Sequence, residues 1–318
     1  MMRLRSLGRS GLQVSELALG TVELGMAYGI PQPGEAPVPD EAEAALILQR
    51  AVDAGITLID TARAYGLAEE RIGRALGHRR HEIVLASKFT LVGPDRSVLR
   101  GDDLRRHFWA SLEASLVALR TDHLDVYQVH AGADPAILGD GVIVELLSAA
   151  KAQGKIRLAG LSAYGVALPL AGLASGGFDV LQVAYNVLDR RMEAAVFPQA
   201  QAQGVGVIVR SALLKGALTE RGDHLPDHLA PLREASQTFR RLARELPGRP
   251  TPVQAALRFC LAHPAVSAAL IGVRSLPELD EARGLTAIPD LSPHVITQLE
   301  TLALTDEELL NPGTWGIP

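Results

Sequence analysis

The sequence predicts an α/β fold, a single (β/α)8 barrel of the TIM type, and three observations support this prediction. Eight short, nearly continuous aliphatic runs alternate with longer amphipathic stretches, and runs of this kind are typical of parallel strands covered on both faces. Eight is also the number of strands that closes a barrel, and 318 residues suffice for one barrel of roughly 250 residues or more. We therefore expect one domain spanning residues 1–318. A doubly wound open sheet, with the same alternation of strands and helices, is the alternative.

The expected strands are the aliphatic runs themselves. Residues 3–15 precede the first of them and read as a small hairpin, a plug under the barrel. Residues 214–235 are irregular and marked by proline and glycine, and so long a loop in a compact domain is more often functional than accidental. The eight runs cover residues 17–20, 56–60, 83–88, 124–130, 156–162, 180–184, 205–211 and 268–272.

Helix starts and stops are marked by local signals. Asp40 is expected to cap a helix that Gly55 ends. Apolar residues at helical spacing predict another helix over residues 102–120. A capping residue followed by proline occurs at residues 251–252 and again at 292–293, which predicts two further helix starts. The second of these would begin an extra helix near the C-terminus.

Composition and charge exclude several classes of protein. The formal net charge is only −5, which argues against nucleic acid as the main partner. No uninterrupted apolar run reaches the roughly 20 residues that span a bilayer, and the N-terminus lacks the apolar stretch of a signal peptide. Cys260 is the only cysteine, so we expect no internal disulfide and interpret Cys260 as a small core residue. These features predict a cytoplasmic protein without a membrane partner.

Four ionisable side chains gather at the ends of three consecutive expected strands. Asp60, Lys88 and His130 end the second, third and fourth strands, and Tyr65 follows in the loop after Asp60. In a barrel these strands are neighbours, and active sites form at the rim where strands end. Each residue alone is more often structural than functional, but four at consecutive strand ends are hard to obtain by chance.

The set suits the reduction of a carbonyl, which requires a hydride at carbon and a proton at oxygen. Tyrosine is a weak acid with a reference pKa of about 10, and the ammonium of Lys88 is expected to lower the pKa of Tyr65. Asp60 would pair with Lys88 and hold it in place, and His130 would orient the substrate oxygen. Proton transfer from such a positioned side chain contributes roughly 10²–10⁴-fold in rate.

Three segments resemble the aldo-keto reductase family signature with its Asp, Tyr, Lys and His tetrad: GITLIDTARAYGLAEERIGRAL, VLASKF and DVYQVH. The resemblance covers nearly the whole chain, from LALGTVELG to IGVRSLPELDEA. It implies an oxidoreductase that passes hydride between NADP(H) or NAD(H) and an aldehyde, ketone or aldose-type substrate. Carried over residue by residue, Tyr65 is the proton donor, Lys88 and Asp60 tune it, and His130 positions the carbonyl.

The resemblance also implies a set of cofactor contacts. Ser162 and Gln182 match the residues that hold the nicotinamide carboxamide, while Ala163 stands where the family usually has asparagine. Arg210 replaces an aromatic residue that stacks on nicotinamide in many members, and a guanidinium plane is able to stack in the same way. The implied contacts are Gly20, Thr21, Asp60, Ser162, Gln182, Arg210, Ser211, Leu213, Arg221, Gly272, Arg274, Glu278 and Glu281.

The choice of cofactor depends on two of these residues. Arg274 is placed to meet the 2′-phosphate of NADP(H), because arginine is a strong donor to phosphate. Glu278 stands where many members have arginine or glutamine, and Ala282 replaces the usual asparagine at the adenine. A carboxylate there would repel phosphate or accept hydrogen bonds from the ribose of NAD(H). We expect NADP(H), with NAD(H) as the alternative.

Several further expectations concern partners and alternatives. The substrate pocket would be lined by Met26, Tyr28, Phe89 and Trp315, and the loop VELGMAYGIPQPG favours a small polar substrate such as a sugar aldehyde or lactol.

No metal is expected. His224 and His228 have the spacing of metal ligands on a helix, but Pro226 between them disfavours a regular helix there. A cofactor-sensing regulatory protein on the same fold is the alternative to an enzyme, and the intact tetrad favours the enzyme.

Overall fold

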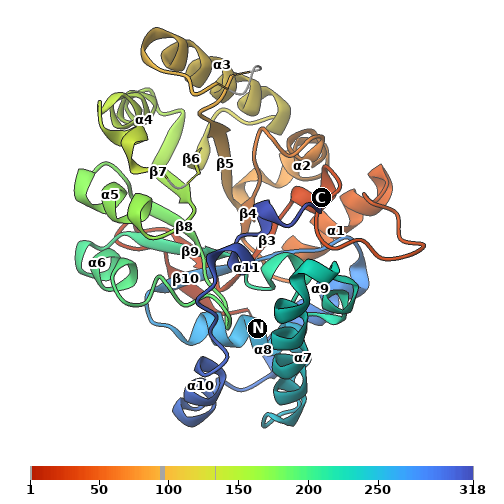
Figure 1. Ribbon diagram of the computed structural model, residues 1–318. Coiled ribbons are helices and arrows are strands. Elements are labelled where there is room, and N and C mark those ends of the chain that lie inside the picture. The colour runs from red at the N-terminus through yellow and green to blue at the C-terminus, as the bar shows by residue number, and fades with distance from the viewer. Residues whose placement is uncertain (1, 94–96, 133, 318) are drawn as a thin grey trace.

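The computed structural model describes residues 2–93, 97–132 and 134–317, in which eight parallel strands close into a barrel. The last strand pairs with both the seventh and the first, so the sheet has no free edge and the open-sheet alternative is wrong. Figure 1 shows the strands at the centre of a ring of helices. The barrel strands are β3 (Leu17–Gly20), β4 (Leu58–Asp60), β5 (Val84–Thr90), β6 (Leu124–His130), β7 (Ile156–Ala163), β8 (Val180–Ala184), β9 (Gly206–Arg210) and β10 (Val266–Gly272).

All eight expected strands are therefore confirmed, with ends that shift by a few residues. Most of the helices that follow them cover the outside of the barrel, while the short α11 (Glu307–Leu310) lies over the strands at the centre of the view (Figure 1). The helices are α1 (Glu41–Asp53), α2 (Ala68–Leu76), α3 (Gly101–Leu119), α4 (Val142–Ala152), α5 (Ala167–Ser175), α6 (Val196–Gln203), α7 (Ala230–Glu245), α8 (Pro252–Ala262), α9 (Leu276–Arg283), and beyond the last strand α10 (Pro293–Glu300) and α11 (Glu307–Leu310).

The helix signals in the sequence act as expected. The Asp40 side chain accepts a hydrogen bond from the backbone of Glu43 at the start of α1. Gly55 follows the helix with a φ of +87°, in the left-handed region that glycine adopts at little cost. Thr251 and Gln254 form a reciprocal capping box at the start of α8, and Ser292 caps α10 in the same position relative to its proline.

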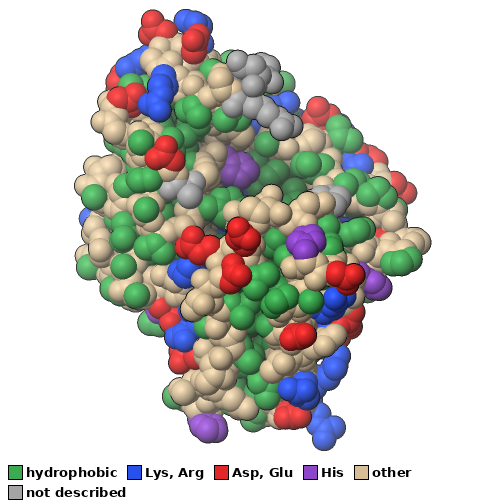
Figure 2. Space-filling model, in the orientation of Figure 1, with side chains coloured by type: hydrophobic (Ala, Val, Ile, Leu, Met, Phe, Trp, Pro, Cys, Tyr) green, Lys and Arg blue, Asp and Glu red, His purple; other side chains and the backbone are tan. Residues whose placement is uncertain are grey.

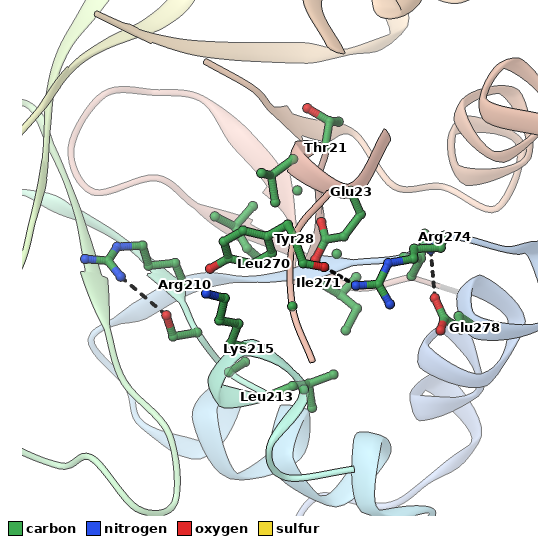
Figure 3. A pocket seen from close by; sticks show the side chains of 18 of the residues that line it. Thr21, Glu23, Tyr28, Arg210, Leu213, Lys215, Leu270, Ile271, Arg274 and Glu278 are labelled. Atoms are coloured by element: carbon green, nitrogen blue, oxygen red, sulfur yellow. Dashed lines mark hydrogen bonds between the residues drawn. The ribbon is translucent and has the colours of Figure 1, made fainter. Parts of the chain in front are cut away.

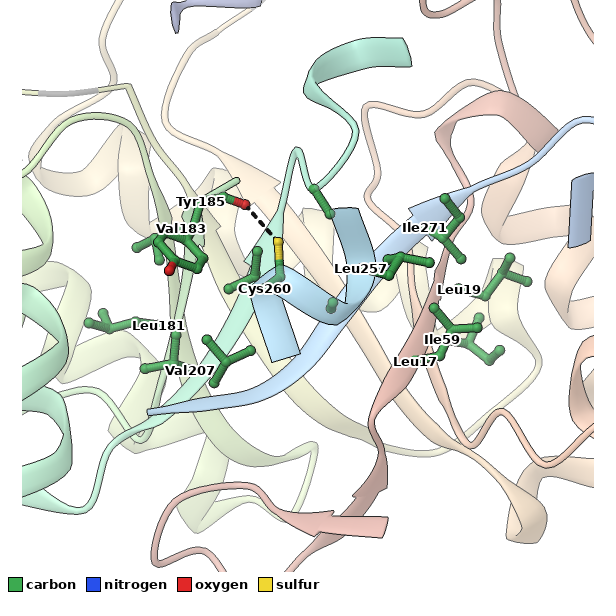
Figure 4. Packing of buried hydrophobic residues seen from close by; sticks show 14 of the residues in the cluster. Leu17, Leu19, Ile59, Leu181, Val183, Tyr185, Val207, Leu257, Cys260 and Ile271 are labelled. Atoms are coloured by element: carbon green, nitrogen blue, oxygen red, sulfur yellow. Dashed lines mark hydrogen bonds between the residues drawn. The ribbon is translucent and has the colours of Figure 1, made fainter. Parts of the chain in front are cut away.

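The N-terminal hairpin closes the bottom of the barrel, as expected. Strand β1 (Leu4–Ser6) pairs antiparallel with β2 (Gln13–Ser15). Leu7 and Val14 are fully buried and belong to the small apolar cluster formed by inward-facing side chains of the barrel strands, among them Val126 and Ile208. The larger part of the core lies between the strands and the helices (Figure 4).

Cys260 lies in this outer layer of the core. It is fully buried on α8, where its thiol donates a hydrogen bond to the carbonyl oxygen of Tyr185 at 3.3 Å (Figure 4). Burial raises the pKa of the thiol. A neutral thiol packed in this way is a small core residue, as the sequence indicated.

The segment after β9 is more ordered than expected. Residues 214–235 contain three short 3-10 helices, Leu214–Gly216, Glu220–His224 and Asp227–Leu229, followed by the start of α7. They lie at the end of the barrel where the strands end, because they follow β9 directly. His224 and His228 fall in different 3-10 helices.

Charged side chains of both signs lie on the face of the molecule that Figure 2 presents. Acidic and basic side chains are interspersed there, without a broad basic patch. Within the described residues, no helix combines the length and the apolar character needed to cross a bilayer.

Candidate active site

Three neighbouring strands bring the four predicted residues together. Strand β5 pairs with β4 on one side and with β6 on the other. The Nζ atom of Lys88 lies 2.5 Å from a carboxylate oxygen of Asp60 and 3.4 Å from the hydroxyl of Tyr65. The rings of Tyr65 and His130 meet edge to face with centroids 5.8 Å apart. The structure thus assembles the tetrad at the barrel rim.

The pair formed by Asp60 and Lys88 is almost completely buried, with side-chain exposures of 3% and 0%. Lys88 also donates to the carbonyl oxygen of Thr61 at 2.9 Å. The second carboxylate oxygen of Asp60 accepts hydrogen bonds from the side-chain amides of Gln128 at 3.0 Å and Gln182 at 2.8 Å. A buried ion pair is stable only when its remaining hydrogen-bonding positions are satisfied in this way. The pair therefore holds the ammonium of Lys88 in a fixed position beside Tyr65.

The pKa of Tyr65 moves in the direction opposite to the one expected. Burial is the main cause of its rise, and the Asp60 carboxylate adds to it, while Arg210 acts in the other direction. Burial also lowers the pKa of Lys88, although Asp60 opposes that effect. The expectation of a lowered pKa for Tyr65 is wrong as a net effect, because burial outweighs the nearby positive charge. Tyr65 is accordingly a neutral phenol at neutral pH, the form that donates a proton.

His130 is a neutral imidazole in this environment. Burial lowers its pKa to about 3, helped by the positive charges of Lys88 and Arg210. Its Nδ1 atom is buried and has no hydrogen-bond partner among the described residues. A neutral ring orients a substrate oxygen through one N–H group and does not compete with Tyr65 as the acid.

A pocket of about 560 Å³ opens above the tetrad, a size typical of sites for small molecules and cofactors. Figure 3 shows Arg210 on one side of this pocket and Arg274 with Glu278 on the other, with Tyr28 and Leu270 between them. Of the implied cofactor contacts, all but Ser162 line it: Gly20, Thr21, Asp60, Gln182, Arg210, Ser211, Leu213, Arg221, Gly272, Arg274, Glu278 and Glu281.

Ser162 and Gln182 act within the wall of the pocket. Ser162 is 2% exposed and donates to the side-chain oxygen of Gln182 at 3.2 Å. Because the side-chain amide of Gln182 donates a hydrogen bond to Asp60, a chain of hydrogen bonds connects β7 to the buried ion pair. In the structure Gln182 supports the tetrad directly, and Ser162 supports it through Gln182.

Arg210 is held against an aromatic residue that the sequence analysis missed. Its guanidinium lies 3.8 Å from the ring centroid of Tyr164, and it donates to the carbonyl oxygen of Ala163 at 2.9 Å. Tyr164 follows β7 directly and lines the pocket. The guanidinium that replaces an aromatic residue at the end of β9 is thus fixed in orientation by stacking.

The loop after β9 carries local backbone strain. Ser211, Leu214 and Lys215 all have positive φ, between 46° and 58°, a conformation that costs a residue other than glycine of order 1–3 kcal/mol and is typical of ligand clamps. Lys215 lies 5.0 Å from the ring centroid of Tyr28 and donates to the carbonyl oxygen of Ile317 at 2.9 Å. The loop, the segment after β3 and the C-terminal tail therefore meet over the pocket.

The expected substrate-pocket residues divide into two groups. Met26 and Tyr28 line the pocket. Phe89 does not, because it is fully buried against Phe108 and Tyr127 on the outer side of β5. Trp315 is 1% exposed and donates its indole N–H to the carbonyl oxygen of Glu308. For Phe89 and Trp315 the expectation is wrong, since both are core residues.

Glu23, Tyr164 and Lys215 are among the pocket residues that the sequence did not single out. Each lies in a loop that follows a barrel strand, and loops in that position build the active sites of barrels. A search of every strand-to-helix loop for charged and aromatic side chains would have found them.

Glu23 is the most unusual of the three. One of its carboxylate oxygens is buried without a hydrogen-bond partner in the described part of the chain. A Cβ atom at Gly272 would overlap this carboxylate, so a larger residue there would require the Glu23 side chain to move. Burial raises the pKa of Glu23 from 4.5 to about 7, an effect that Glu278 strengthens while Arg274 and Arg221 weaken it.

The raised pKa of Glu23 predicts a pH-dependent stability. A carboxyl group whose pKa is higher in the folded state stabilises the fold fully below about pH 4.5, and this contribution is lost as the pH rises through 7. Glu23→Gln should therefore gain stability relative to the wild type between pH 5 and pH 8, as measured by urea unfolding. Glu145→Gln, which changes an exposed carboxylate, is the control. A difference between Glu23→Gln and wild type that stays constant with pH would contradict the assignment.

No metal centre emerges from the described residues, where no group of three or more His, Cys, Asp or Glu side chains is arranged to hold an ion. The chemistry available at the pocket is that of a neutral phenol, a neutral imidazole, a buried ion pair and several arginines.

Comparisons with known proteins agree with this arrangement. The model of the aldo/keto reductase family matches residues 16–303. Aldo-keto reductase YhdN of Bacillus subtilis is 29% identical over 94% of this chain and 94% of its own length. The uncharacterised oxidoreductase YrpG of the same organism is 32% identical over 86% of this chain and 87% of its own length.

A solved structure gives the same result. Aldo-keto reductase AKR11C1 from Bacillus halodurans, in its holo form, superposes with a TM-score of 0.78 at 28% identity. The match covers 98% of this chain and all of that one. With the family matched over nearly the whole chain and the tetrad assembled at the end of a closed barrel, this chain belongs to the aldo/keto reductase family and is an oxidoreductase.

Proposed function

We propose that this protein transfers hydride between a nicotinamide cofactor and a carbonyl group, with Tyr65 donating the proton during reduction and accepting it during oxidation. The observation that carries the proposal is the position of the Tyr65 hydroxyl, 3.4 Å from the Nζ atom of Lys88 in the buried Lys88–Asp60 pair, at the base of a pocket of about 560 Å³. The bound cofactor supplies or accepts the hydride. The chain's own residues would bind the cofactor, position the substrate and transfer the proton.

The residues present fit such a cofactor. Arg210 and Arg274 lie on opposite sides of the pocket, so the pocket suits an extended ligand (Figure 3). Arg221 and Arg274 offer charged donors suited to phosphate, and the loop after β9 is strained as ligand clamps are. Gly20 lines the pocket at the end of β3, where the absence of a side chain lets a ligand come close to the backbone.

Proton transfer and binding of the substrate oxygen would take place at the end of the pocket that contains Tyr65 and His130. The substrate carbonyl oxygen would lie between the hydroxyl of Tyr65 and the ring of His130, within hydrogen-bond reach of both. Lys88 stabilises the tyrosinate that forms when Tyr65 gives up its proton, because its ammonium lies 3.4 Å from that oxygen. Polar neighbours such as Tyr28 and Gln32 suit a small polar substrate, a sugar aldehyde or lactol.

A regulatory protein that only senses the cofactor is the second candidate. It would need the pocket but not the tetrad. The complete set of hydrogen bonds around Asp60 and Lys88 favours the enzyme, since a sensor gains nothing from a proton donor held in this way.

We further propose that NADP(H) is the preferred cofactor, through a contact between Arg274 and the 2′-phosphate, and that no divalent metal takes part. Steady-state assays with aldehydes and aldoses should give turnover with NADPH, with a higher kcat/KM than NADH. Arg274→Ala should lower kcat/KM for NADPH while leaving that for NADH nearly unchanged. Exhaustive chelation should leave both rates intact.

Three results would count against these proposals. Absence of turnover with every substrate tested, together with cofactor binding, would favour the regulatory protein. A tenfold preference for NADH, about 1.4 kcal/mol, would make Glu278 the leading determinant in place of Arg274. A rate lost on chelation and restored by Zn²⁺ or Mg²⁺ would require a metal.

A further inference from the structure

Two arginines and two glutamates form a closed cluster at the end of the pocket away from Tyr65. Glu35 bridges the two guanidinium groups, with contacts of 2.5 Å to Arg221 and 3.3 Å to Arg274. Glu278 accepts a second bond from Arg221 at 2.7 Å. The four side chains come from the loops after β3, β9 and β10 and from the start of α9. These three strands are neighbours in the barrel, so their loops meet over the same end of the pocket.

This end would face the adenosine half of a nicotinamide dinucleotide, an argument that depends on the function proposed above. The nicotinamide ring has to lie beside Tyr65 for hydride to reach the carbonyl. The positive charge of Arg210 acts on both Tyr65 and His130, which places Arg210 at the reacting end. Arg274 lies across the pocket from Arg210 (Figure 3), so the remainder of an extended dinucleotide runs toward Arg274.

The cluster has no positive charge to spare. Two guanidinium groups are balanced by two carboxylates, and the side chains of Arg221 and Arg274 are only 14% and 11% exposed. A phosphate monoester carries roughly −1.5 to −2 charges at pH 7. It therefore meets two arginines that are already neutralised, unless one of the carboxylates moves away.

Glu35 is the carboxylate able to move. Glu278 is fixed in the first turn of α9, where its second oxygen accepts a hydrogen bond from the backbone N–H of Arg274 at 2.7 Å. Glu35 lies in the segment 25–39. This segment follows the 3-10 helix Val22–Leu24 and itself contains no helix or strand. The contacts of Glu35 are made through the side chain to Arg221 and Arg274. Rotation of that side chain removes one carboxylate from both guanidinium groups at once, while Arg221 keeps its bond to Glu278.

The backbone of segment 25–39 is held independently of Glu35. Arg274 donates to the carbonyl oxygen of Tyr28, and Arg221 donates to that of Ile30 at 3.3 Å. Removing the Glu35 carboxylate therefore leaves the segment attached at two other points.

We propose that Glu35 is a specificity-determining residue that competes with the 2′-phosphate of NADP(H) for Arg221 and Arg274. NADP(H) has to displace the Glu35 carboxylate in order to bind, whereas NAD(H), which has only a hydroxyl at that position, leaves the bridge in place. Glu35 thus holds down the affinity for NADP(H) and lets the protein use both cofactors.

Equilibrium binding without substrate tests the proposal. Dissociation constants for NADPH and NADH are measured by fluorescence titration on wild type, Glu35→Gln, Arg274→Ala and the double variant. Glu35→Gln should bind NADPH about tenfold more tightly and NADH within twofold of wild type. The gain should vanish when Arg274→Ala is also present, because the phosphate then lacks its partner. Glu145→Gln, which removes a carboxylate paired with Arg105 far along the chain, is the matched control.

The outcomes separate this proposal from its alternatives. An equal gain for NADPH and NADH would mean that Glu35 only closes the segment 25–39 over any ligand, and would overturn the proposal. Unchanged affinities would overturn it as well. Urea unfolding verifies that Glu35→Gln is folded, and Glu35→Asp, which keeps the charge, should retain more of the wild-type discrimination. If wild type binds neither dinucleotide, the function proposed above fails, whatever Glu35 does.

Discussion

Tyr65→Phe should lower kcat by roughly 10²–10⁴-fold, the contribution of a positioned general acid. The substitution removes one hydroxyl and keeps the ring that packs edge to face against His130. Because the cofactor contacts lie elsewhere in the pocket, the dissociation constant for NADPH should stay within about twofold of wild type. Stopped-flow or steady-state reduction of an active aldehyde measures the first effect, and fluorescence titration measures the second.

Tyr127→Phe is the matched control for this variant. Tyr127 is also buried, and burial also raises its pKa, but its hydroxyl contacts Ser111 on α3 and does not face the pocket. Its loss should leave turnover near the wild-type value. Wild-type turnover in Tyr65→Phe would refute the role of Tyr65, and an equal loss in both variants would indicate a general effect of removing a buried hydroxyl.

Lys88→Met should reduce both turnover and stability. The substitution leaves the Asp60 carboxylate buried without its countercharge, although the amides of Gln128 and Gln182 still donate to it. Breaking a buried ion pair by removing one partner costs about 3–5 kcal/mol, and Tyr65 loses the ammonium that stabilises its anion. We expect a fall in kcat of at least about 10²-fold and a lower urea midpoint.

The double variant Asp60→Asn with Lys88→Met separates the two effects. Neutralising both partners removes the buried charge, so most of the stability should return while turnover stays low. Lys151→Met is the control for stability, because its ion pair with Asp179 is partly exposed and should contribute only about 0–1 kcal/mol. A single variant Lys88→Met that is as stable and as active as wild type would contradict the structural role of the pair.

The sequence was sufficient for the architecture because the relevant signals are local. Eight aliphatic runs each lie within one strand, and the caps at Asp40, Thr251 and Ser292 each act within one helical turn. The number of strands favoured a barrel over an open sheet, and the pairing of β10 with β3 decided the closure. The tetrad followed from strand order, since residues at the ends of consecutive parallel strands are brought side by side by the topology alone.

The electrostatics of the site needed the tertiary structure. The sequence places Lys88 near Tyr65 and suggests a lowered pKa, yet burial raises the pKa of Tyr65 and the Asp60 carboxylate adds to the rise. The direction of such a shift depends on desolvation and on every neighbouring charge. Neither quantity is readable from the spacing of a few residues.

The lining of the pocket likewise depends on long-range packing. Phe89 and Trp315 look like pocket residues in the sequence, but the register of β5 and the path of the C-terminal tail bury both in the core. Glu35 and Arg221 are 186 positions apart and still form a bridge. The sequence by itself determined the eight strands, the helix caps and the four residues at the strand ends, because each depends on a pattern within one element or on strand order. Only the tertiary structure decided the closure of the barrel, the direction of the Tyr65 pKa shift and the charge balance at the far end of the pocket, because these result from groups that lie far apart in the sequence.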